Sequence, residues 1–343
     1  IREFIVDVVS KNPGHLSSNL GVVELTIALH YCFDFKRDKI VWDVGHQAYV
    51  HKILTGRRSK FPTLRQYKGL SGFPDKNESL YDPFTCGHSG NAISAALGMS
   101  CADSILGYKR SIVAVVGDGA IGAGMSFEAL NHAGDLKKNL LVVLNDNEMS
   151  ISNTVGAFSK YLNKIRTAPL YADIKKEIHN VLNVLPVFGK PVGKTLEHVV
   201  ELLRRGAIPG QIFEDLGINY FGPIDGHNFQ ILIETLNDIK HLEGPVLLHV
   251  ITEKGRGFEP AYQNPTQYHS AGKFEMCNGK ILETANEPKK ISYTKVFGDT
   301  LIELAKADLK VVGITAAMPD GTGIAAFGKK FPDRFYDVGI CEQ

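Results

Sequence analysis

The sequence is poor in cysteine and shows no cysteine pattern. Its five cysteines stand far apart, and no two form a C-x-x-C pair. A scattered, odd-numbered set argues against a disulfide framework and against a zinc site, and it favours a reducing cytoplasm. An excess of one charge is also missing. The formal net charge is +1, so the composition gives no indication of a nucleic-acid partner.

Long hydrophobic runs are absent as well. No stretch reaches the roughly 18 uncharged apolar residues of a membrane-spanning helix, so we expect no membrane partner. The first residues, Ile1–Ser10, are amphipathic and lack the basic leader, apolar centre and cleavage site of a signal peptide. Because no methionine stands at position 1, we expect the sequence to begin inside a longer protein.

Strand-like and helix-like segments alternate regularly along the sequence. The expected strands are short, uninterrupted and rich in β-branched residues, as strands buried on both faces should be. They are residues 39–43, 111–116, 139–144 and 245–252. Apolar residues recur at helical spacing in residues 22–31, 93–105, 125–136 and 229–240. This alternation predicts the α/β class, with a parallel sheet that carries helices on both faces.

The length of 343 residues allows two domains. We expect a first α/β domain at 1–274, with a Lys-, Asn- and Pro-rich insertion at 155–210 that is mobile or packs over a site. The polar stretch 275–290 predicts a linker, and 291–343 predicts the start of a second α/β domain. About fifty residues are too few to close an ordinary core, so we expect this second domain to be incomplete.

Polar residues follow two neighbouring predicted strands at the point where each strand ends. Gly117-Asp118-Gly119 follows the strand 111–116, and Asn145-Asp146-Asn147 ends the next one. One strand–helix–strand unit separates the two motifs, so both should lie at the same edge of a parallel sheet. The Asp118 carboxylate and the Asn147 amide, with phosphate oxygens, suit Mg²⁺, and the glycines allow backbone N–H groups to approach a ligand. The sequence therefore predicts a seat for a metal–diphosphate.

The same residues also spell a rival motif. Gly117–Gly122 satisfies G-x-G-x-x-G after a strand, which is the dinucleotide fingerprint. That fingerprint needs an acidic residue at the end of the second strand, whereas Asp135 stands before it. A carboxylate inside the loop would also repel a pyrophosphate unless a metal intervened. The pattern favours the metal–diphosphate interpretation and leaves nicotinamide binding or a purely structural glycine turn as alternatives.

Several histidines stand beside glycines or polar residues in expected loops. They are His15, His46, His88, His227 and His269, and His46 directly follows a predicted strand. Gly87-His88-Ser89-Gly90 before a helix and Lys254-Gly255-Arg256-Gly257 after a strand could each contact an anion. The remaining histidines inside predicted elements are interpreted as packing residues: His30, His132, His179, His198 and His249.

With these motifs, the sequence resembles the thiamine-diphosphate-dependent transketolase superfamily, and within it the family of 1-deoxy-D-xylulose-5-phosphate synthases. The resemblance runs from His15 to Glu342 and is carried by a set of characteristic strings. These are the metal–diphosphate pair above, 14–21 (GHLSSNLG), 42–49 (WDVGHQAY), 51–57 (HKILTGR), 222–227 (GPIDGH) and 254–260 (KGRGFEP). One departure is Gly90-Asn91-Ala92-Ile93, where the family commonly has small hydroxyl residues.

The resemblance implies the condensation of pyruvate with D-glyceraldehyde 3-phosphate, which gives CO₂ and 1-deoxy-D-xylulose 5-phosphate, with thiamine diphosphate and Mg²⁺ as cofactors. By position, the metal ligands would be Asp118, Asn147 and the backbone carbonyl of Met149. The cofactor would contact His46, Gly87, His88, Ser89, Gly119, Ala120, Asn147, Lys254, Phe258 and Glu342. Glu342 would hydrogen-bond the aminopyrimidine ring, and His15, His46 and His269 would line the reacting side as catalytic residues.

Three alternatives stay open. Transketolase itself moves a two-carbon unit between sugar phosphates and needs no decarboxylation, and residues 42–49 and 222–227 favour the synthase over it. A non-catalytic paralogue would bind thiamine diphosphate without turnover, although the presence of Asp118, Asn147 and Glu342 together argues against decay. Nicotinamide binding is the third. We expect a homodimer, since a partly built second domain would leave an exposed face.

Overall fold

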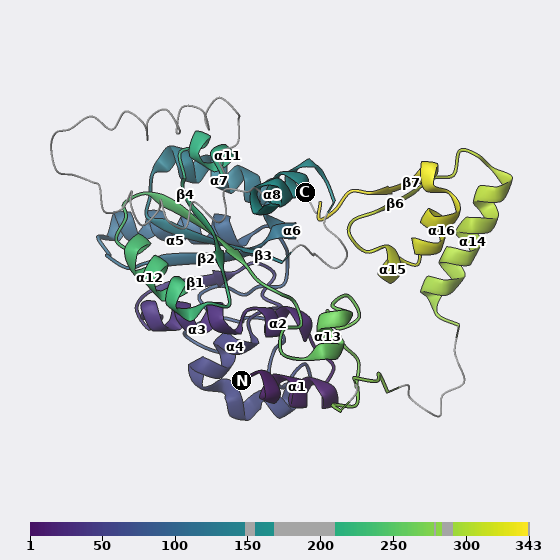
Figure 1. The fold of residues 1–343 in the computed structure, drawn as a ribbon, viewed down its shortest axis with the longest axis horizontal. Helices are drawn as coiled ribbons and strands as arrows, with labels where there is room; N and C mark the ends of the chain where they lie inside the picture. Colours follow the sequence, from purple (N-terminus) through teal and green to yellow (C-terminus); the bar gives the residue numbers. More distant parts are fainter. Residues whose placement is uncertain (148–154, 168–209, 278, 283–290, 342–343) are drawn as a thin grey trace.

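The computed structural model describes residues 1–147, 155–167, 210–277, 279–282 and 291–341 (Figure 1). A larger and a smaller unit, each with its own sheet, make up this structure (Figure 1). The strands of the larger unit are β1 (Lys39–Trp42), β2 (Ile112–Gly117), β3 (Leu140–Asp146), β4 (Asn219–Asp225) and β5 (Pro245–Ile251). Its helices are α1 (Arg2–Lys11), α2 (Ser17–Gly21), α3 (Val23–Cys32), α4 (Tyr49–Lys52), α5 (Ala92–Leu106), α6 (Asp118–Ile121), α7 (Gly124–Leu136), α8 (Ala157–Thr167), α11 (Gln211–Asp215), α12 (Phe229–Ile239) and α13 (Glu259–Gln263). A π-helical turn (Ile53–Arg57) and a 3₁₀ helix (Arg58–Thr63) follow α4.

The larger sheet is entirely parallel, with the strand order β1-β2-β3-β5-β4. In its centre Val115 pairs with Val143, and Val143 pairs with Leu248. All three side chains are fully buried, because the sheet is covered on both faces. The predicted α/β class with a parallel sheet is therefore confirmed, together with the four strands and four helices expected from the alternating pattern.

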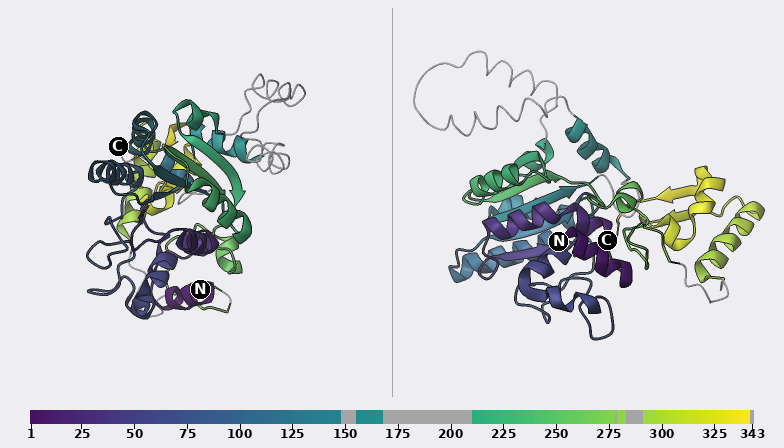
Figure 2. Two further views of the ribbon diagram at one scale, coloured as in Figure 1. Left: turned by 90° about the vertical axis from the view of Figure 1, so that its left-hand side faces the viewer. Right: turned by 60° about the horizontal axis from the view of Figure 1, so that its bottom comes forward.

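Each face of this sheet has its own hydrophobic core. On one face α5, α7, α8 and α11 supply residues such as Ile93, Leu130 and Phe213. On the other face α3 and α12 supply residues such as Leu25 and Leu232. Figure 2 shows the sheet between these helical layers. Because both faces are apolar, polar groups that a ligand could use are left at the edges of the sheet where the loops leave it.

The sequence pattern did not predict β4 or α8. In β4, Gly222-Pro223 interrupts the strand, and the pairing with β5 shifts register between Phe221 and Ile224. Proline removes a backbone donor, so this edge strand lacked the uninterrupted run of the others. α8 lies at the start of the predicted insertion, and its Leu162 and Ile165 are buried in the core of the larger unit. Of the rest of that insertion, residues 168–209 lie outside the described part of the chain.

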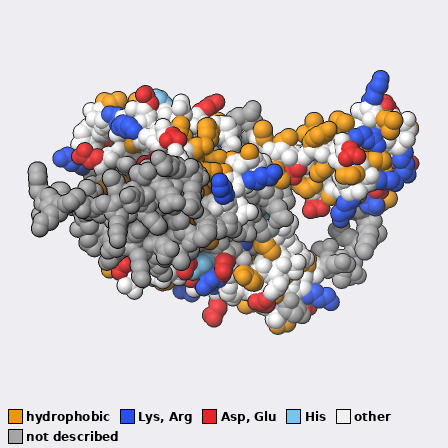
Figure 3. Space-filling model, turned by 45° about the horizontal axis from the view of Figure 1, so that its top comes forward, with side chains coloured by type: hydrophobic (Ala, Val, Ile, Leu, Met, Phe, Trp, Pro, Cys, Tyr) orange, Lys and Arg blue, Asp and Glu red, His pale blue; other side chains and the backbone are white. Residues whose placement is uncertain are grey.

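The smaller unit contains α14 (Tyr293–Ala307), β6 (Gly313–Thr315), α15 (Pro319–Thr322), α16 (Ala325–Lys330), a 3₁₀ turn (Pro332–Arg334) and β7 (Phe335–Asp337). Its two strands are parallel, and Ala305, Ile324 and Phe327 form a small core. Each strand exposes one large apolar side chain, Ile314 at 66% on β6 and Tyr336 at 53% on β7. Figure 3 shows hydrophobic side chains gathered on the surface of this unit.

Among the described residues, we find no helix with the length and apolar character required to cross a membrane.

The central strands should account for much of the stability of the larger unit. We expect Leu248→Ala to lower the free energy of unfolding by about 2–5 kcal/mol, because the fully buried side chain would leave a cavity between the sheet and its helices. Leu106→Ala is the control, since Leu106 is 62% exposed at the end of α5, and it should change stability by less than about 0.5 kcal/mol. Urea denaturation measures both values, and equal effects would contradict this account of the core.

Candidate active site

A cavity of about 450 Å³ opens at the carboxyl edge of the larger sheet. The loops that follow β1, β2, β3 and β5 form most of its wall, and the smaller unit adds Ala316, Met318, Ile340 and Cys341. The predicted site residues that line this cavity are His15, His46, Gly87, Ser89, Asp118, Gly119, Ala120, Asn147, Lys254 and His269. Residues far apart in the sequence therefore meet there because all five strands point towards the same edge.

The cavity brings a carboxylate and an ammonium group together at low exposure. Asp118 is 8% exposed at the end of β2, and Lys254 is 8% exposed in the loop after β5. Burial, together with the negative charge of Asp146, raises the pKa of Asp118 to about 7, while Lys254 opposes this rise. Burial lowers the pKa of Lys254 to about 8, against the attraction of Asp118. A divalent cation beside Asp118 and an anion beside Lys254 would compensate both buried charges.

The turn after β2 leaves room for a ligand. A Cβ atom at Gly117 would meet no atom within 4 Å. Gly119 and Ala120 also line the cavity. On the neighbouring strand β3, Asn145 pairs with Gly117, and its amide oxygen accepts a hydrogen bond of 2.6 Å from the Thr252 hydroxyl, which fixes the end of β3. This edge thus presents oxygen donors and backbone groups around open space, as a metal–diphosphate requires.

The loop with Gly87 and Ser89 is held by a carboxylate that sequence analysis did not single out. Asp43, 1% exposed at the end of β1, accepts hydrogen bonds from the backbone N–H groups of Gly90, at 3.0 Å, and Ala92, at 3.1 Å. The Ser89 hydroxyl lies 3.4 Å from the same carboxylate. Asp43 lies in the family string 42–49. No pattern in the sequence indicates that its carboxylate accepts hydrogen bonds from backbone N–H groups more than forty positions away.

Three imidazoles form one wall of the cavity. The ring centroids of His15 lie 5.6 Å from His46 and 5.7 Å from His269, and those of His46 and His269 are 5.1 Å apart. The Asn19 side chain fixes two of the three loops, because its Nδ2 donates to the carbonyl of His15 at 2.8 Å and to that of His46 at 2.7 Å. No motif in the sequence predicted that Asn19 would connect the loops of His15 and His46.

A two-residue bridge brings His269 to His15. The backbone N–H of Ala271 donates to the carbonyl of Gly14 at 2.8 Å, and the Gly14 N–H donates back at 3.1 Å. The carbonyl of Tyr268 also accepts the N–H groups of Leu16 and Ser17. The first and the last loops of the larger unit are thus joined at the cavity by main-chain hydrogen bonds.

The histidine wall is neutral at pH 7. Burial, together with the Arg65 charge, lowers the pKa of His15 to about 4. Burial, together with Lys254 and His15, lowers the pKa of His269 to about 3, and burial also holds the pKa of His46 well below its usual value. Neutral imidazoles offer one donor and one acceptor each, so this wall can hydrogen-bond carboxylate or carbonyl oxygens without adding charge.

A network of polar side chains lies behind β3. The Asp146 carboxylate contacts Arg166 Nη1 at 2.9 Å and His249 Nε2 at 2.9 Å, and His249 Nδ1 lies 2.8 Å from the Tyr220 hydroxyl. His249, predicted to be a packing residue, is fully buried in this network. This network fixes Asp146, whose negative charge raises the pKa of Asp118 from the end of the neighbouring strand.

The other predicted site residues lie elsewhere. His88 is exposed and does not line the cavity, although its carbonyl accepts the Val44 N–H at 3.2 Å. Phe258 packs against Tyr268 and Phe274 rather than into the cavity. His227 contacts the Glu24 carboxylate at 3.0 Å, in a structural role. Met149 and Glu342 lie outside the described residues.

Solved structures with a comparable arrangement include transketolases. The transketolase of Campylobacter jejuni matches with a TM-score of 0.57 at 21% identity, over 79% of this chain and 39% of that one. A mutant transketolase from Pichia stipitis matches with a TM-score of 0.58 at 19% identity, over 97% of this chain and 46% of that one. At these identities the likeness shows the fold, so the chain has the architecture of the transketolase class.

The sequence comparisons narrow this class to one family. Residues 1–252 match the 1-deoxy-D-xylulose-5-phosphate synthase family, and residues 289–343 match the transketolase pyrimidine binding domain. Over 343 residues the chain is 53% identical to the 1-deoxy-D-xylulose-5-phosphate synthase of Alkaliphilus oremlandii and 53% identical to 1-deoxy-D-xylulose-5-phosphate synthase 1 of Geobacter sulfurreducens. These matches cover 100% of this chain and 54% of each relative, so the chain spans about half the length of the curated relatives it matches. The chain belongs to the family of 1-deoxy-D-xylulose-5-phosphate synthases.

The low pKa of His15 has a consequence for stability. An unfolded histidine protonates near pH 6.5, whereas folded His15 protonates only near pH 4, so acid favours the unfolded chain across this window. Between pH 7 and pH 4.5 the free energy of unfolding of the wild type should fall. In His15→Gln, which lacks this titrating group, we expect the fall to be smaller by on the order of 2 kcal/mol. Urea denaturation at a series of pH values measures this difference. The control is His241→Gln, at an exposed position, and equal slopes for the two variants would contradict the prediction.

Proposed function

We propose that the protein condenses pyruvate with D-glyceraldehyde 3-phosphate to give 1-deoxy-D-xylulose 5-phosphate and CO₂, with thiamine diphosphate and Mg²⁺. One observation carries the proposal. A buried carboxylate, a buried ammonium group and three neutral imidazoles line one cavity at the carboxyl edge of a parallel sheet. Relatives that are 53% identical to this chain are 1-deoxy-D-xylulose-5-phosphate synthases, which supports the same reaction.

The donor groups of the cavity fit the two cofactors. Asp118 and Asn147 offer hard oxygen ligands for Mg²⁺, and Lys254 offers a buried positive charge for a diphosphate. Among the described residues, no group of three or more His, Cys, Asp or Glu side chains is arranged to hold a metal. The ion would therefore take its remaining ligands from backbone oxygens, for which we propose the carbonyl of Met149, and from the diphosphate itself.

The protein's own residues would then bind and orient the reactants. When bound, thiamine diphosphate supplies a carbon nucleophile and an electron sink for the loss of CO₂ from a 2-keto acid. The backbone of Gly119 and Ala120 would contact the diphosphate, and Glu342 would hydrogen-bond the aminopyrimidine ring. Neutral His15 and His269 would hydrogen-bond the pyruvate carboxylate or the aldehyde oxygen and move protons at those oxygens.

We further propose that the protein is a cytoplasmic homodimer. The exposed apolar side chains of β6 and β7, such as Ile314 and Tyr336, support an interface, since contiguous exposed apolar surface usually marks an interaction site. All five cysteines are free, which fits a reducing compartment. We assign no nucleic-acid or membrane partner.

Release of CO₂ tests the proposed reaction against transketolase chemistry. We expect the protein, supplied with thiamine diphosphate and Mg²⁺, to release CO₂ from pyruvate at a rate that rises at least tenfold when D-glyceraldehyde 3-phosphate is added. Labelled pyruvate and trapped CO₂ give the rate. Transfer of a two-carbon unit between sugar phosphates without CO₂ release would overturn the proposal in favour of a transketolase.

Removal of the proposed metal ligand tests the cofactor site. We expect Asp118→Asn to weaken the binding of thiamine diphosphate in the presence of Mg²⁺ at least tenfold, which is about 1.4 kcal/mol, because it removes the anionic ligand. Titration calorimetry measures the dissociation constant. The matched control is Asp135→Asn, which removes the exposed acidic residue of the rival dinucleotide motif and should leave binding unchanged. Tight NAD⁺ binding that depends on Asp135 would support the rival instead.

A further inference from the structure

One wall of the cavity is built by a segment without helices or strands. Residues 64–91 form only turns and bends, yet they bring Phe73, Gly87 and Ser89 to the cavity. Asp43 holds the last turn of this segment. A different set of contacts must fix its middle, because turns alone do not keep an open segment in one place.

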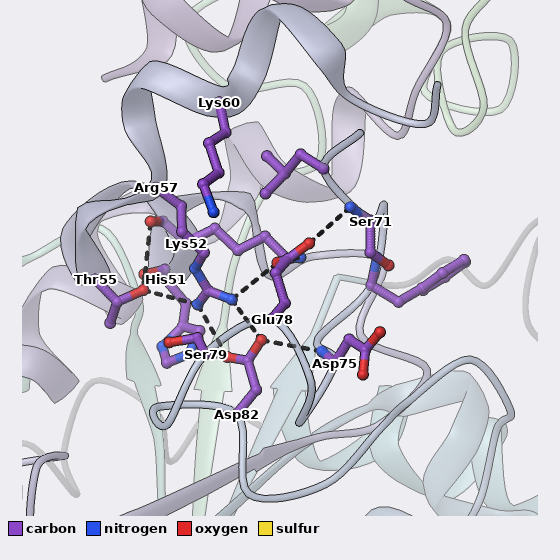
Figure 4. A network of polar contacts seen from close by, with 12 residues as sticks. His51, Lys52, Thr55, Arg57, Lys60, Ser71, Asp75, Glu78, Ser79 and Asp82 are labelled. Atoms are coloured by element: carbon purple, nitrogen blue, oxygen red, sulfur yellow. Dashed lines mark hydrogen bonds and ion pairs between the residues drawn. The ribbon is translucent and has the colours of Figure 1, made fainter. Parts of the chain in front are cut away.

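Asp82 is the first anchor of this segment. Its carboxylate, with no exposed side-chain surface, accepts two hydrogen bonds from the Arg57 guanidinium and lies 2.9 Å from His51 Nε2 (Figure 4). It also accepts the backbone N–H of Asp75 at 3.0 Å. Burial alone would raise the pKa of Asp82, but the hydrogen bonds from His51 and Arg57 lower it below its ordinary value, so the carboxylate stays ionised.

Glu78 is the second anchor. Its Oε2 pairs with the Lys52 ammonium and, at 3.1 Å, with Arg57 Nη1 (Figure 4). Its Oε1 accepts the Ser71 N–H at 2.8 Å. The Lys52 side chain has no exposed surface and that of Arg57 is 4% exposed, so both cations depend on these two carboxylates for compensation.

This ion cluster (His51, Lys52, Arg57, Glu78 and Asp82) is connected to the cavity through Pro74. Asp75, bound to Asp82, directly follows Pro74, and the Pro74 carbonyl accepts the N–H of Cys86, the residue before Gly87. Pro74 also packs against Gly45, the residue before His46, where an added Cβ would approach Pro74 Cδ to 2.4 Å. The cluster thus fixes two neighbouring parts of the cavity wall.

We propose that the ion cluster positions the cavity wall around Phe73, Gly87 and Ser89 and thereby sets the affinity for thiamine diphosphate. Its members are positioning residues, since none of the five lines the cavity. The inference rests on the proposed function for the identity of the ligand. It also gives a role to the string His51–Arg57, which the proposed reaction leaves unused.

Two isosteric substitutions test this inference. We expect Asp82→Asn and Glu78→Gln each to weaken the binding of thiamine diphosphate with Mg²⁺ at least tenfold in titration calorimetry. Turnover at saturating cofactor should stay within threefold of the wild-type value. In the free protein, trypsin should cut after Lys68 or Lys76, which are exposed, at least fivefold faster than in wild type.

Asp103→Asn is the matched control. It breaks another Arg–Asp pair, at the amino edge of the sheet, in which Asp103 is 4% exposed and accepts two bonds of 2.6 Å from Arg110, whose side chain is 25% exposed. We expect unchanged cofactor affinity and unchanged cleavage within residues 64–91. If Asp82→Asn fails to fold, Glu78→Gln decides, because it keeps the acceptor for Ser71.

The outcomes separate this inference from the proposed function. Folded variants with wild-type affinity and wild-type cleavage would overturn the inference alone, as would equal losses in Asp103→Asn. Absence of thiamine diphosphate binding by the wild type would overturn the proposed function and the affinity part of the inference. The cleavage rates would then decide whether the cluster anchors the segment.

Discussion

The organisation of this protein depends on the parallel pairing of five strands, of which the central three, β2, β3 and β5, are buried on both faces. Such a sheet can expose polar loops only at its ends, and all its carboxyl ends lie at one edge. Asp118, Asn147 and Lys254 meet at one cavity because each follows a different strand of this sheet. The apolar layers supply the stability that permits charged groups at the edge to stay in place.

Bringing charged and polar side chains together at a buried cavity costs desolvation free energy. The structure limits this cost in two ways. Opposite charges face each other, as with Asp118 and Lys254, so each partly offsets the desolvation of the other. The imidazoles of His15, His46 and His269 stay neutral, so the wall they form adds no repulsion to Lys254 at neutral pH. Under the proposed function, a site arranged in this way would be prepared for anionic ligands and a cation before either arrives.

Much of the fold could be predicted from the sequence, because β-branched runs and helical spacing report burial directly. The pattern failed at β4, where Gly222-Pro223 interrupts the run. It also failed at α8, where lysines and asparagines conceal the buried Leu162 and Ile165. The boundaries proposed for the two domains and the linker stay predictions.

The sequence likewise predicted only part of the candidate site. Residues that line the cavity, such as Asp118, Asn147 and Lys254, could be predicted because motifs at strand ends mark them. Residues that position the cavity loops could not be predicted. Asp43 and Asn19, for example, hydrogen-bond to backbone groups of loops that are remote in the sequence. His88 and Phe258 do not line the cavity, because a matching string does not specify which way a side chain points, and their predicted contacts with the cofactor stay predictions. The roles of Met149 and Glu342 stay predictions.

The bridge between Gly14 and Ala271 bears on the order in which a ribosome delivers the chain. His15 precedes all five strands of the larger sheet in the sequence, yet its neighbour His269 and the carbonyl of Tyr268 follow only after β5 and α13 have been made. A nascent chain therefore holds no complete histidine wall until nearly the whole larger unit has left the exit tunnel. Contacts so distant in sequence also form late in refolding, because a long loop must close before they are gained. An unfinished chain would thus be spared premature binding of the anionic ligands that we propose for the complete cavity.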